Sequence, residues 1–196
     1  MRENIILRSC NPEEYPDLTI SCRVIENDKI GEYVTQIPEE RRSVSTKYAP
    51  VEARPGQEGE AITTTLYVER DGRRYILSEE TTTVKVRPVG EQMLSDIVVR
   101  NINSTSDEEY VVKAAKFLDT YIPNEDGTYS PISEERQFYQ VSEDVIIVTA
   151  WGSKAVCLNG SYIVEYNAEE NDYNTVEQGA KNSTYQDVTV PKKVKQ

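Results

Sequence analysis

The stretch ITTTLYVERDGRRYILS, residues 62–78, decides the fold class. Two runs rich in β-branched and aromatic residues, 62–69 and 74–78, flank the pair Asp71-Gly72. Asp-Gly adopts the left-handed backbone conformations that a two-residue hairpin loop requires, and between two β-rich runs it is a strong hairpin signal. The stretch therefore predicts two antiparallel strands joined by a tight turn.

Further strands are expected on both sides of this hairpin. Residues 81–86 alternate apolar and polar side chains, which predicts a third strand of a meander. Alternation at 18–24, a polar turn at 26–29 and a β-rich run at 30–37 predict an N-terminal hairpin. Later strands are expected at residues 96–100, 136–141, 144–150, 154–158, 161–166 and 184–190.

Two of these later segments carry additional signals. The continuous apolar run of residues 145–148 is typical of a strand that is buried on both faces. The pair Asn159-Gly160 lies between 154–158 and 161–166, so the rule used for Asp71-Gly72 predicts a second tight hairpin there.

One main helix is expected after residue 105. Ser106 with Glu109 three residues later has the spacing of a capping box, and the helix would end before Pro123. Residues 175–181 can add one or two helical turns. The predicted buried stripe of the main helix consists of Val111, Ala114, Ala115, Leu118 and Tyr121.

The elements together predict an α+β fold that is mainly β, built from antiparallel hairpins and a meander with one main helix. The periodic pattern is lost at 38–61, where prolines, glycines and charges predict a long loop. We expect an N-terminal β-rich region over 1–122 that contains this loop, a small C-terminal β module over 123–190, and a mobile basic tail over 191–196.

The composition excludes several kinds of chemistry. The 196 residues include 34 Asp and Glu against 22 Lys and Arg, which gives a net charge of -12, and no histidine. Catalytic triads and dyads that use histidine are therefore excluded, as are zinc sites with histidine ligands. The negative charge disfavours binding to phosphate backbones and favours a basic protein partner.

The cysteines and the hydropathy pattern indicate a reducing compartment. Cys10, Cys22 and Cys157 are odd in number and match no Cys-x-x-Cys spacing, so we expect reduced thiols rather than a disulfide framework. No apolar window is long enough to cross a membrane, and residues 1–8 do not form the apolar core of a signal peptide. The expected location is the cytoplasm, or a virion if the chain is phage-encoded, without membrane association.

No segment carries a specific catalytic, metal or cofactor signature. The adjacent acids Glu79-Glu80 and Glu169-Glu170 would point to opposite faces of a strand, so they are expected to be solvated surface charges. Residues 124–128 lack the full calcium-loop pattern, and 54–60 lack the Gly-Lys-Ser/Thr of a phosphate loop. We therefore predict no catalytic residues, no metal and no cofactor.

Tyrosine is the one residue type that is conspicuously frequent. The chain has 13 Tyr against 2 Phe and 1 Trp. Tyrosine combines an apolar ring with a polar tip, so it suits both half-buried strand faces and contact surfaces. Packing at the edge of the core is the alternative to a contact role. The predicted interaction surface consists of Tyr33, Tyr67, Tyr75, Tyr162, Tyr166 and Tyr173.

The C-terminal 50 residues or so contain three short motifs. They are Trp151-Gly152, the run GSYIV at 160–164, and Thr184-Tyr185. This part of the chain resembles a small β-rich module of uncharacterised bacterial and phage proteins, in which Trp-Gly is followed by Gly-Asp-Tyr and a terminal Tyr strand. Ser161 stands where that module has Asp. The resemblance implies a compact β unit, often phage-associated, and no catalytic residues.

Three functions follow as hypotheses. The first is a non-enzymatic binding or assembly protein with Tyr-rich β surfaces, which could also self-associate. The second is an acidic inhibitor whose carboxylates imitate the phosphates of nucleic acid in a basic groove of a host protein. The third is an enzyme that uses carboxylate and Tyr groups brought together from distant parts of the chain.

Overall fold

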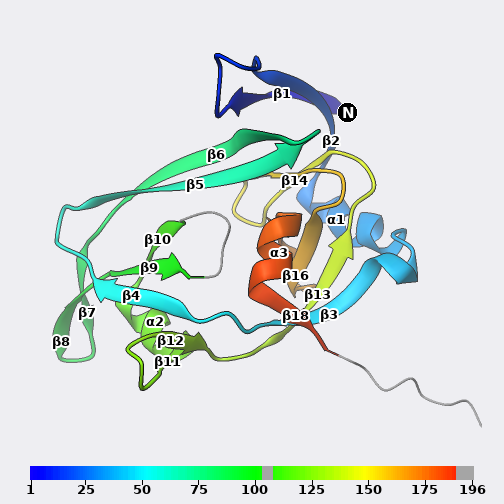
Figure 1. The fold of residues 1–196 in the computed structure, drawn as a ribbon. Coiled ribbons are helices and arrows are strands. Elements are labelled where there is room, and N and C mark those ends of the chain that lie inside the picture. Colours follow the sequence, from blue (N-terminus) through cyan, green and yellow to red (C-terminus); the bar gives the residue numbers. More distant parts are fainter. Residues whose placement is uncertain (103–107, 189–196) are drawn as a thin grey trace, which may run out of the picture. The chain divides into compact units, whose positions relative to one another are not determined.

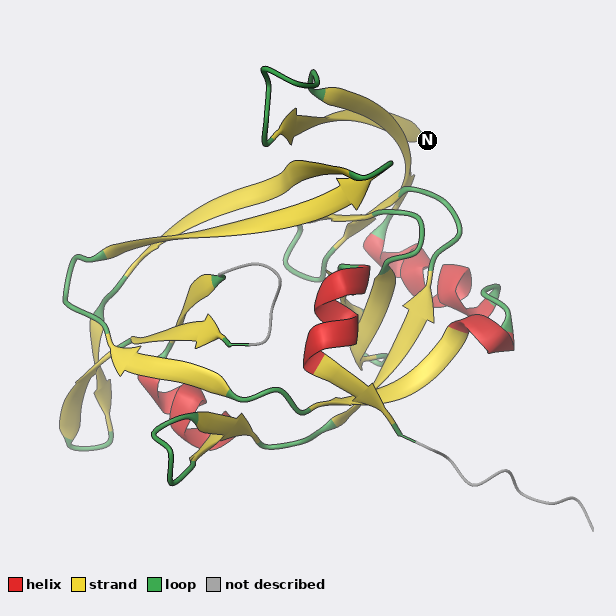
Figure 2. Cartoon of the chain, in the orientation of Figure 1, coloured by secondary structure: helices red, strands yellow, loops and turns green. Residues whose placement is uncertain are grey.

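The computed structural model describes residues 1–102 and 108–188, and strands predominate over helices in it (Figures 1 and 2). The expected α+β, mainly β fold is confirmed. Within the described ranges, no helix is long and apolar enough to span a membrane. The predicted basic tail at 191–196 lies outside the described residues.

Contacts divide the chain into two compact units that are interleaved in sequence. Unit 1 contains Met1, residues 23–47 and residues 133–196, and unit 2 contains residues 2–22 and 48–132. This division differs from the expected boundary after residue 122. It assigns 23–47 to the C-terminal module and 123–132 to the other unit.

Unit 2 contains the hairpin that the sequence predicted. β5 (Ala61–Arg70) and β6 (Arg73–Thr83) pair antiparallel, with Arg70 opposite Arg73. Asp71 has φ 52° and Gly72 has φ 70°, the left-handed conformations of a two-residue hairpin loop. β1 (Arg2–Ser9) pairs with the other side of β6. The predicted separate strand at 81–86 is wrong, since β6 continues to Thr83.

The other strands of unit 2 surround a small aromatic core. Phe117 of α2 (Ala114–Thr120) stacks on Tyr121 at 4.8 Å between ring centroids and meets Tyr129 edge-on at 5.0 Å. The five-stranded sheet has the order β10-β9-β4-β12-β11, and β7 pairs with β8 in a separate hairpin. Their bounds are β4 (Val51–Pro55), β7 (Val86–Val89), β8 (Gln92–Ser95), β9 (Ile97–Asn101), β10 (Glu109–Val112), β11 (Tyr121–Pro123) and β12 (Tyr129–Pro131).

The main helix is shorter than predicted and starts later. Residues 109–112 form β10, which pairs with β9, and α2 begins only at Ala114. The residues of α2 that are buried are Ala114 and Phe117, whereas the predicted stripe members Ala115 and Leu118 are exposed. The spacing of Val111 predicted a helix, but its pairing with β9 places it in a strand. The predicted cap, Ser106, lies outside the described residues.

The expectation of a long loop at 38–61 is wrong. A short 3-10 helix, η1 (Glu39–Arg41), is followed by β3 (Arg42–Lys47) and β4. β3 pairs with β13 (Glu135–Gln140) in unit 1, and β4 pairs with β9 in unit 2. Both partners are far away in sequence, and the charged side chains of these strands hide any local alternation.

Unit 1 contains a five-stranded antiparallel sheet and a smaller set of strands beside it. The sheet has the order β17-β16-β13-β3-β18, with β16 (Tyr162–Asn167), β17 (Asp172–Val176) and β18 (Tyr185–Asp187). β14 (Val145–Val148) pairs antiparallel with β15 (Lys154–Cys157) and parallel with the end of β2 (Leu18–Ile25). Val145, Ile146 and Ile147 are all buried, which confirms the predicted fully buried strand.

The predicted hairpin across Asn159-Gly160 is wrong. β15 pairs with β14, whereas β16 pairs with β13 and β17. Gly160 does adopt a positive φ of 90°, so the local turn forms but leads the chain into a different sheet. The turn signal was therefore correct and the inferred pairing was not.

The prediction of an N-terminal hairpin is also wrong, because residues 27–35 form helix α1 (Asn27–Thr35) rather than a strand. Ile30, Val34 and Ile37 recur at helical spacing and are buried. They pack in the core of unit 1 with residues of β14 and β16, such as Val145, Ile147 and Ile163. The expected turns at 175–181 correspond to α3 (Gln178–Thr184), whose N-terminus is capped by Glu177.

Candidate functional site

The six predicted contact tyrosines are divided between the two units and differ in burial. Tyr67 and Tyr75 belong to unit 2, and the other four belong to unit 1. Tyr75 and Tyr173 are only 3% and 2% exposed, so assigning these two to a contact surface is wrong. For both, the alternative of core packing holds.

The buried tyrosines have interior partners. The Tyr173 hydroxyl donates a hydrogen bond to the carboxylate of Glu165 at 3.4 Å, and Tyr139 donates to the same carboxylate at 2.9 Å. Burial and the Glu165 charge raise the pKa of both phenols. Tyr75 meets Tyr15 edge-on at 5.4 Å. Tyr75 and Tyr173 are therefore packed inside the fold and are not accessible to a partner.

Three of the remaining tyrosines are partly covered by cations. The guanidinium of Arg74 lies 4.0 Å from the Tyr67 ring centroid, and that of Arg136 lies 5.0 Å from Tyr166. The ammonium of Lys181 lies 5.6 Å from Tyr162. Such cation–π contacts stabilise these rings in place within their own units.

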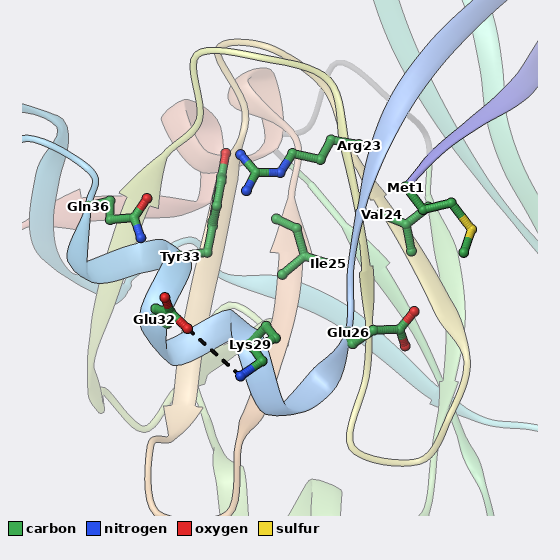
Figure 3. Close-up of a pocket in the computed structure, with 9 residues that line it drawn as sticks. All are labelled: Met1, Arg23, Val24, Ile25, Glu26, Lys29, Glu32, Tyr33 and Gln36. Atoms are coloured by element: carbon green, nitrogen blue, oxygen red, sulfur yellow. Dashed lines mark ion pairs between the residues drawn. The ribbon is translucent and has the colours of Figure 1, made fainter.

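Tyr33 lines a hollow in unit 1, between α1 and the end of β2 (Figure 3). The hollow has a volume of about 500 Å³, within the range of small-ligand and side-chain pockets. Its lining includes half-buried Val24 and buried Ile25, which are consecutive residues of β2. The complete lining is Met1, Arg23, Val24, Ile25, Glu26, Lys29, Glu32, Tyr33 and Gln36.

Several of the charged groups of the hollow are paired with one another or with close neighbours. Arg23 forms an ion pair with Glu143 at 3.3 Å and lies 5.4 Å from the ring centroid of Tyr33. Lys29 lies 3.9 Å from Glu32. Burial, with smaller effects of Glu143 and Cys157, raises the pKa of Tyr33 to about 12. Tyr33 therefore keeps its proton at neutral pH.

A second feature of unit 1 is the turn that joins β14 to β15, residues 149–153, which we call the Trp151 turn. The backbone N–H of Thr149 donates to the carbonyl of Ser153 at 2.8 Å, and that of Gly152 donates to the carbonyl of Thr149 at 2.9 Å. The Thr149 hydroxyl adds a bond to the Ser153 carbonyl at 3.1 Å. Gly152 has φ 83°, a conformation that suits glycine.

This turn displays the single tryptophan of the chain. Trp151 is 62% exposed, although tryptophan is normally among the most buried side chains. The closed turn fixes the backbone on both sides of it. A large aromatic side chain on a preformed turn has little entropy to lose on binding.

Asn27 connects the Trp151 turn to α1 and to the turn between β16 and β17. Its side-chain N–H₂ donates to the carbonyl of Val148 at 3.1 Å and to that of Asn171 at 2.9 Å. Glu26, which lines the hollow, immediately precedes Asn27.

Exposed acidic residues are sequence neighbours of Asn27 and of Asn171. Asp28 follows Asn27, and Glu169 and Glu170 precede Asn171, and all three are exposed. The candidate contact residue that the predicted interaction surface did not include is Trp151. Its signal was a Trp-Gly pair directly after a buried strand, in a chain with only one tryptophan.

Comparisons of this chain with protein-family models, with curated proteins and with solved structures give no match. The resemblance of the C-terminal residues to a Trp-Gly module therefore stays a prediction. In the structure, Trp151-Gly152 lies in the turn just described, and Tyr162 begins β16.

Proposed function

We infer that this chain is a non-enzymatic binding protein that engages a protein partner through the Trp151 turn of unit 1. The observation that carries this proposal is the exposure of Trp151 on a turn closed by its own hydrogen bonds. Tryptophan is enriched among the few residues that contribute most of the binding energy of protein interfaces.

Two further observations support contact rather than catalysis. In the hollow of unit 1, Arg23 and Lys29 are each within ion-pair distance of a carboxylate, and Tyr33 keeps its proton. In addition, half-buried Val24 is an apolar residue in the lining of the hollow.

The test is quantitative affinity capture with the full chain as bait, in an extract of the cells that produce it. The bait is compared as wild type, Trp151→Ala and Leu118→Ala. Leu118 is a matched control, since it is 61% exposed and lies in unit 2. We expect a partner that wild type and Leu118→Ala retain equally and that Trp151→Ala retains about 30-fold less tightly, as for an interface hot spot.

Two results contradict the proposal. One is that the wild-type bait enriches no protein over a bait-free control. The other is that Trp151→Ala recovers the same partner in the same amount, with circular dichroism showing that the variant is folded.

A further inference from the structure

We propose that the hollow between α1 and the end of β2 binds a free aliphatic amino acid in its zwitterionic form (Figure 3). The inference goes beyond the proposed function, because it concerns a small molecule and residues other than those of the Trp151 turn. The volume of about 500 Å³ lies in the range of small-ligand pockets, and the lining offers groups of three kinds. They are donors for a carboxylate, acceptors for an ammonium, and apolar side chains for an aliphatic group.

Arg23 and Tyr33 are the donors for the carboxylate. The Arg23 guanidinium lies 5.4 Å from the ring centroid of Tyr33, and Figure 3 shows the two side chains next to each other. Among the described residues, the hydrogen bond of this guanidinium goes from Nη1 to Glu143 at 3.3 Å. The edge formed by Nε and Nη2 can therefore donate two parallel hydrogen bonds to a ligand carboxylate.

The Tyr33 hydroxyl is a further donor. Tyr33 is half-buried, and no hydrogen bond joins its hydroxyl to any residue that the structure describes. Burial raises the pKa of Tyr33 to about 12, so the hydroxyl carries its proton at neutral pH and can donate it to a carboxylate. A hydroxyl that is partly removed from water without a partner gains free energy when a ligand supplies one.

Glu26 and Glu32 are the acceptors for the ammonium. Both residues line the hollow, and in Figure 3 their carboxylates lie on the opposite side of Ile25 from the Arg23 guanidinium. Glu26 occupies the N-cap position of α1 but makes no capping hydrogen bond, and the Glu32 carboxylate is 3.9 Å from Lys29, which is longer than a hydrogen bond. Within α1, neither carboxylate is therefore held by a short hydrogen bond.

The lining as a whole matches a molecule that is neutral but carries both signs. The charged side chains in the lining are two cations and two anions, namely Arg23, Lys29, Glu26 and Glu32. Half-buried Val24 and buried Ile25 provide apolar contact for an aliphatic side chain. A free amino acid carries its carboxylate and its ammonium on one carbon atom, whereas peptide bonds remove at least one of these groups from every residue of a peptide. The lining therefore favours the free amino acid.

The test is a two-dimensional NMR titration of the full chain with L-leucine and two analogues of similar shape. 4-Methylpentanoate lacks the ammonium, and 3-methylbutylamine lacks the carboxylate. We expect saturable shifts of the amide signals of residues 23–36 with L-leucine. 4-Methylpentanoate should bind about fivefold more weakly, since it loses two exposed charge pairs of about 0.5 kcal/mol each. 3-Methylbutylamine should bind about tenfold more weakly, because it loses the charge-assisted hydrogen bonds of the carboxylate.

Matched variants then assign each half of the ligand. Tyr33→Phe keeps the ring and removes the hydroxyl, so it should weaken L-leucine about fivefold, the value of one hydrogen bond of about 1 kcal/mol. Tyr67→Phe is its control, since Tyr67 lies under the Arg74 guanidinium in unit 2, and it should leave the affinity unchanged. Glu26→Gln/Glu32→Gln should weaken L-leucine about fivefold and leave the affinity for 4-methylpentanoate unchanged.

The assignment is overturned if L-leucine gives no saturable shifts at residues 23–36, if either analogue binds as tightly as L-leucine, or if Tyr33→Phe and Tyr67→Phe have the same effect. It is also overturned if Glu26→Gln/Glu32→Gln weakens L-leucine and 4-methylpentanoate alike. The signal dispersion of each variant shows whether it is folded, so a loss of binding by a folded variant reports on the hollow. Capture of a partner through Trp151 is a separate measurement, and its outcome bears only on the proposed function.

Discussion

Lys181 is only 6% exposed, yet it carries a charged group into unit 1. Its ammonium donates to the carboxylate of Asp187 and lies 5.5 Å and 5.6 Å from the ring centroids of Phe138 and Tyr162. Asp187 also accepts a hydrogen bond from the Ser45 hydroxyl at 2.5 Å. A buried ammonium requires a compensating charge or hydrogen bonds. Here the Asp187 carboxylate provides them, and its bonds connect α3 and β18 to β3.

The Asp187 carboxylate should therefore contribute stability that depends on pH. Hydrogen bonds from Lys181 and Ser45 hold the pKa of Asp187 below its ordinary value. A lowered folded-state pKa gives stabilisation that is complete above the unfolded pKa of about 3.9 and is lost as the pH falls through the folded pKa. We expect Asp187→Asn to be less stable than wild type from pH 5 to 8, with a difference that shrinks below about pH 4.

Urea unfolding of both proteins across this pH range measures the difference. Glu58→Gln is the control, since Glu58 is an exposed carboxylate of unit 2. A constant difference between Asp187→Asn and wild type down to pH 2 would refute the assignment.

At the scale of single elements, helix α1 contains a glycine in its interior. Gly31 has no positive φ, and an added Cβ would meet only the Tyr173 hydroxyl, at an ordinary contact distance of 3.7 Å. Glycine in a helix interior costs about 0.5–1 kcal/mol relative to alanine. We expect Gly31→Ala to raise the free energy of unfolding by about that amount, measured by the urea midpoint.

The opposite effect is expected at the hairpin loop of unit 2. Gly72 has φ 70°, where a side chain is strained whatever the surrounding space. Gly72→Ala should therefore lower the stability by about 1 kcal/mol. If Gly31→Ala and Gly72→Ala changed the free energy of unfolding in the same direction, the backbone φ of the glycine would not explain their effects.

The β5–β6 hairpin and helix α1 show which elements can be predicted from local sequence and which cannot. The β5–β6 hairpin could be predicted because its whole signal lies within 62–78. Residues 30–37 contain β-branched residues typical of a strand and also the helical spacing of Ile30, Val34 and Ile37. Only the core contributed by 141–173 decides between the two, and that information is distant in the sequence.

The candidate site was predictable only in part for a related reason. Tyr162 and Tyr173 lie on neighbouring strands, yet Tyr173 points into the core and Tyr162 is only half-buried. Which face of a strand is covered depends on pairing and on the layer above it, and neither is local. Trp151 carried a local signal, but its exposure follows from the position of the turn at the end of a buried strand.

At the scale of the whole molecule, the units do not follow the sequence-based division. Ile25, Ile30, Val34 and Ile37 supply four of the ten buried residues of the main core cluster of unit 1, and β3 pairs with both β13 and β18. A fragment of residues 123–190 lacks these four side chains and β3. We expect this fragment to be unfolded, with poor amide dispersion in a two-dimensional NMR spectrum.

A shortened chain that restores residues 23–47 tests whether their absence is what prevents folding. Lys47 and Ser133 are close, since the Ser133 hydroxyl donates to the Lys47 carbonyl at 3.4 Å. A short Gly-Ser linker can therefore join 23–47 directly to 133–188, and this chain should fold. A cooperative unfolding transition of 123–190 alone would contradict the division into interleaved units.

The interleaving also orders events on the ribosome. Every segment of unit 2 has been synthesised once residue 132 is made, whereas unit 1 must wait for 133–188. Throughout that interval the nascent chain carries Ile30, Val34 and Ile37 without the strands that later cover them. Chaperone binding during translation should therefore concentrate on residues 23–47 and end when the last strands leave the exit tunnel.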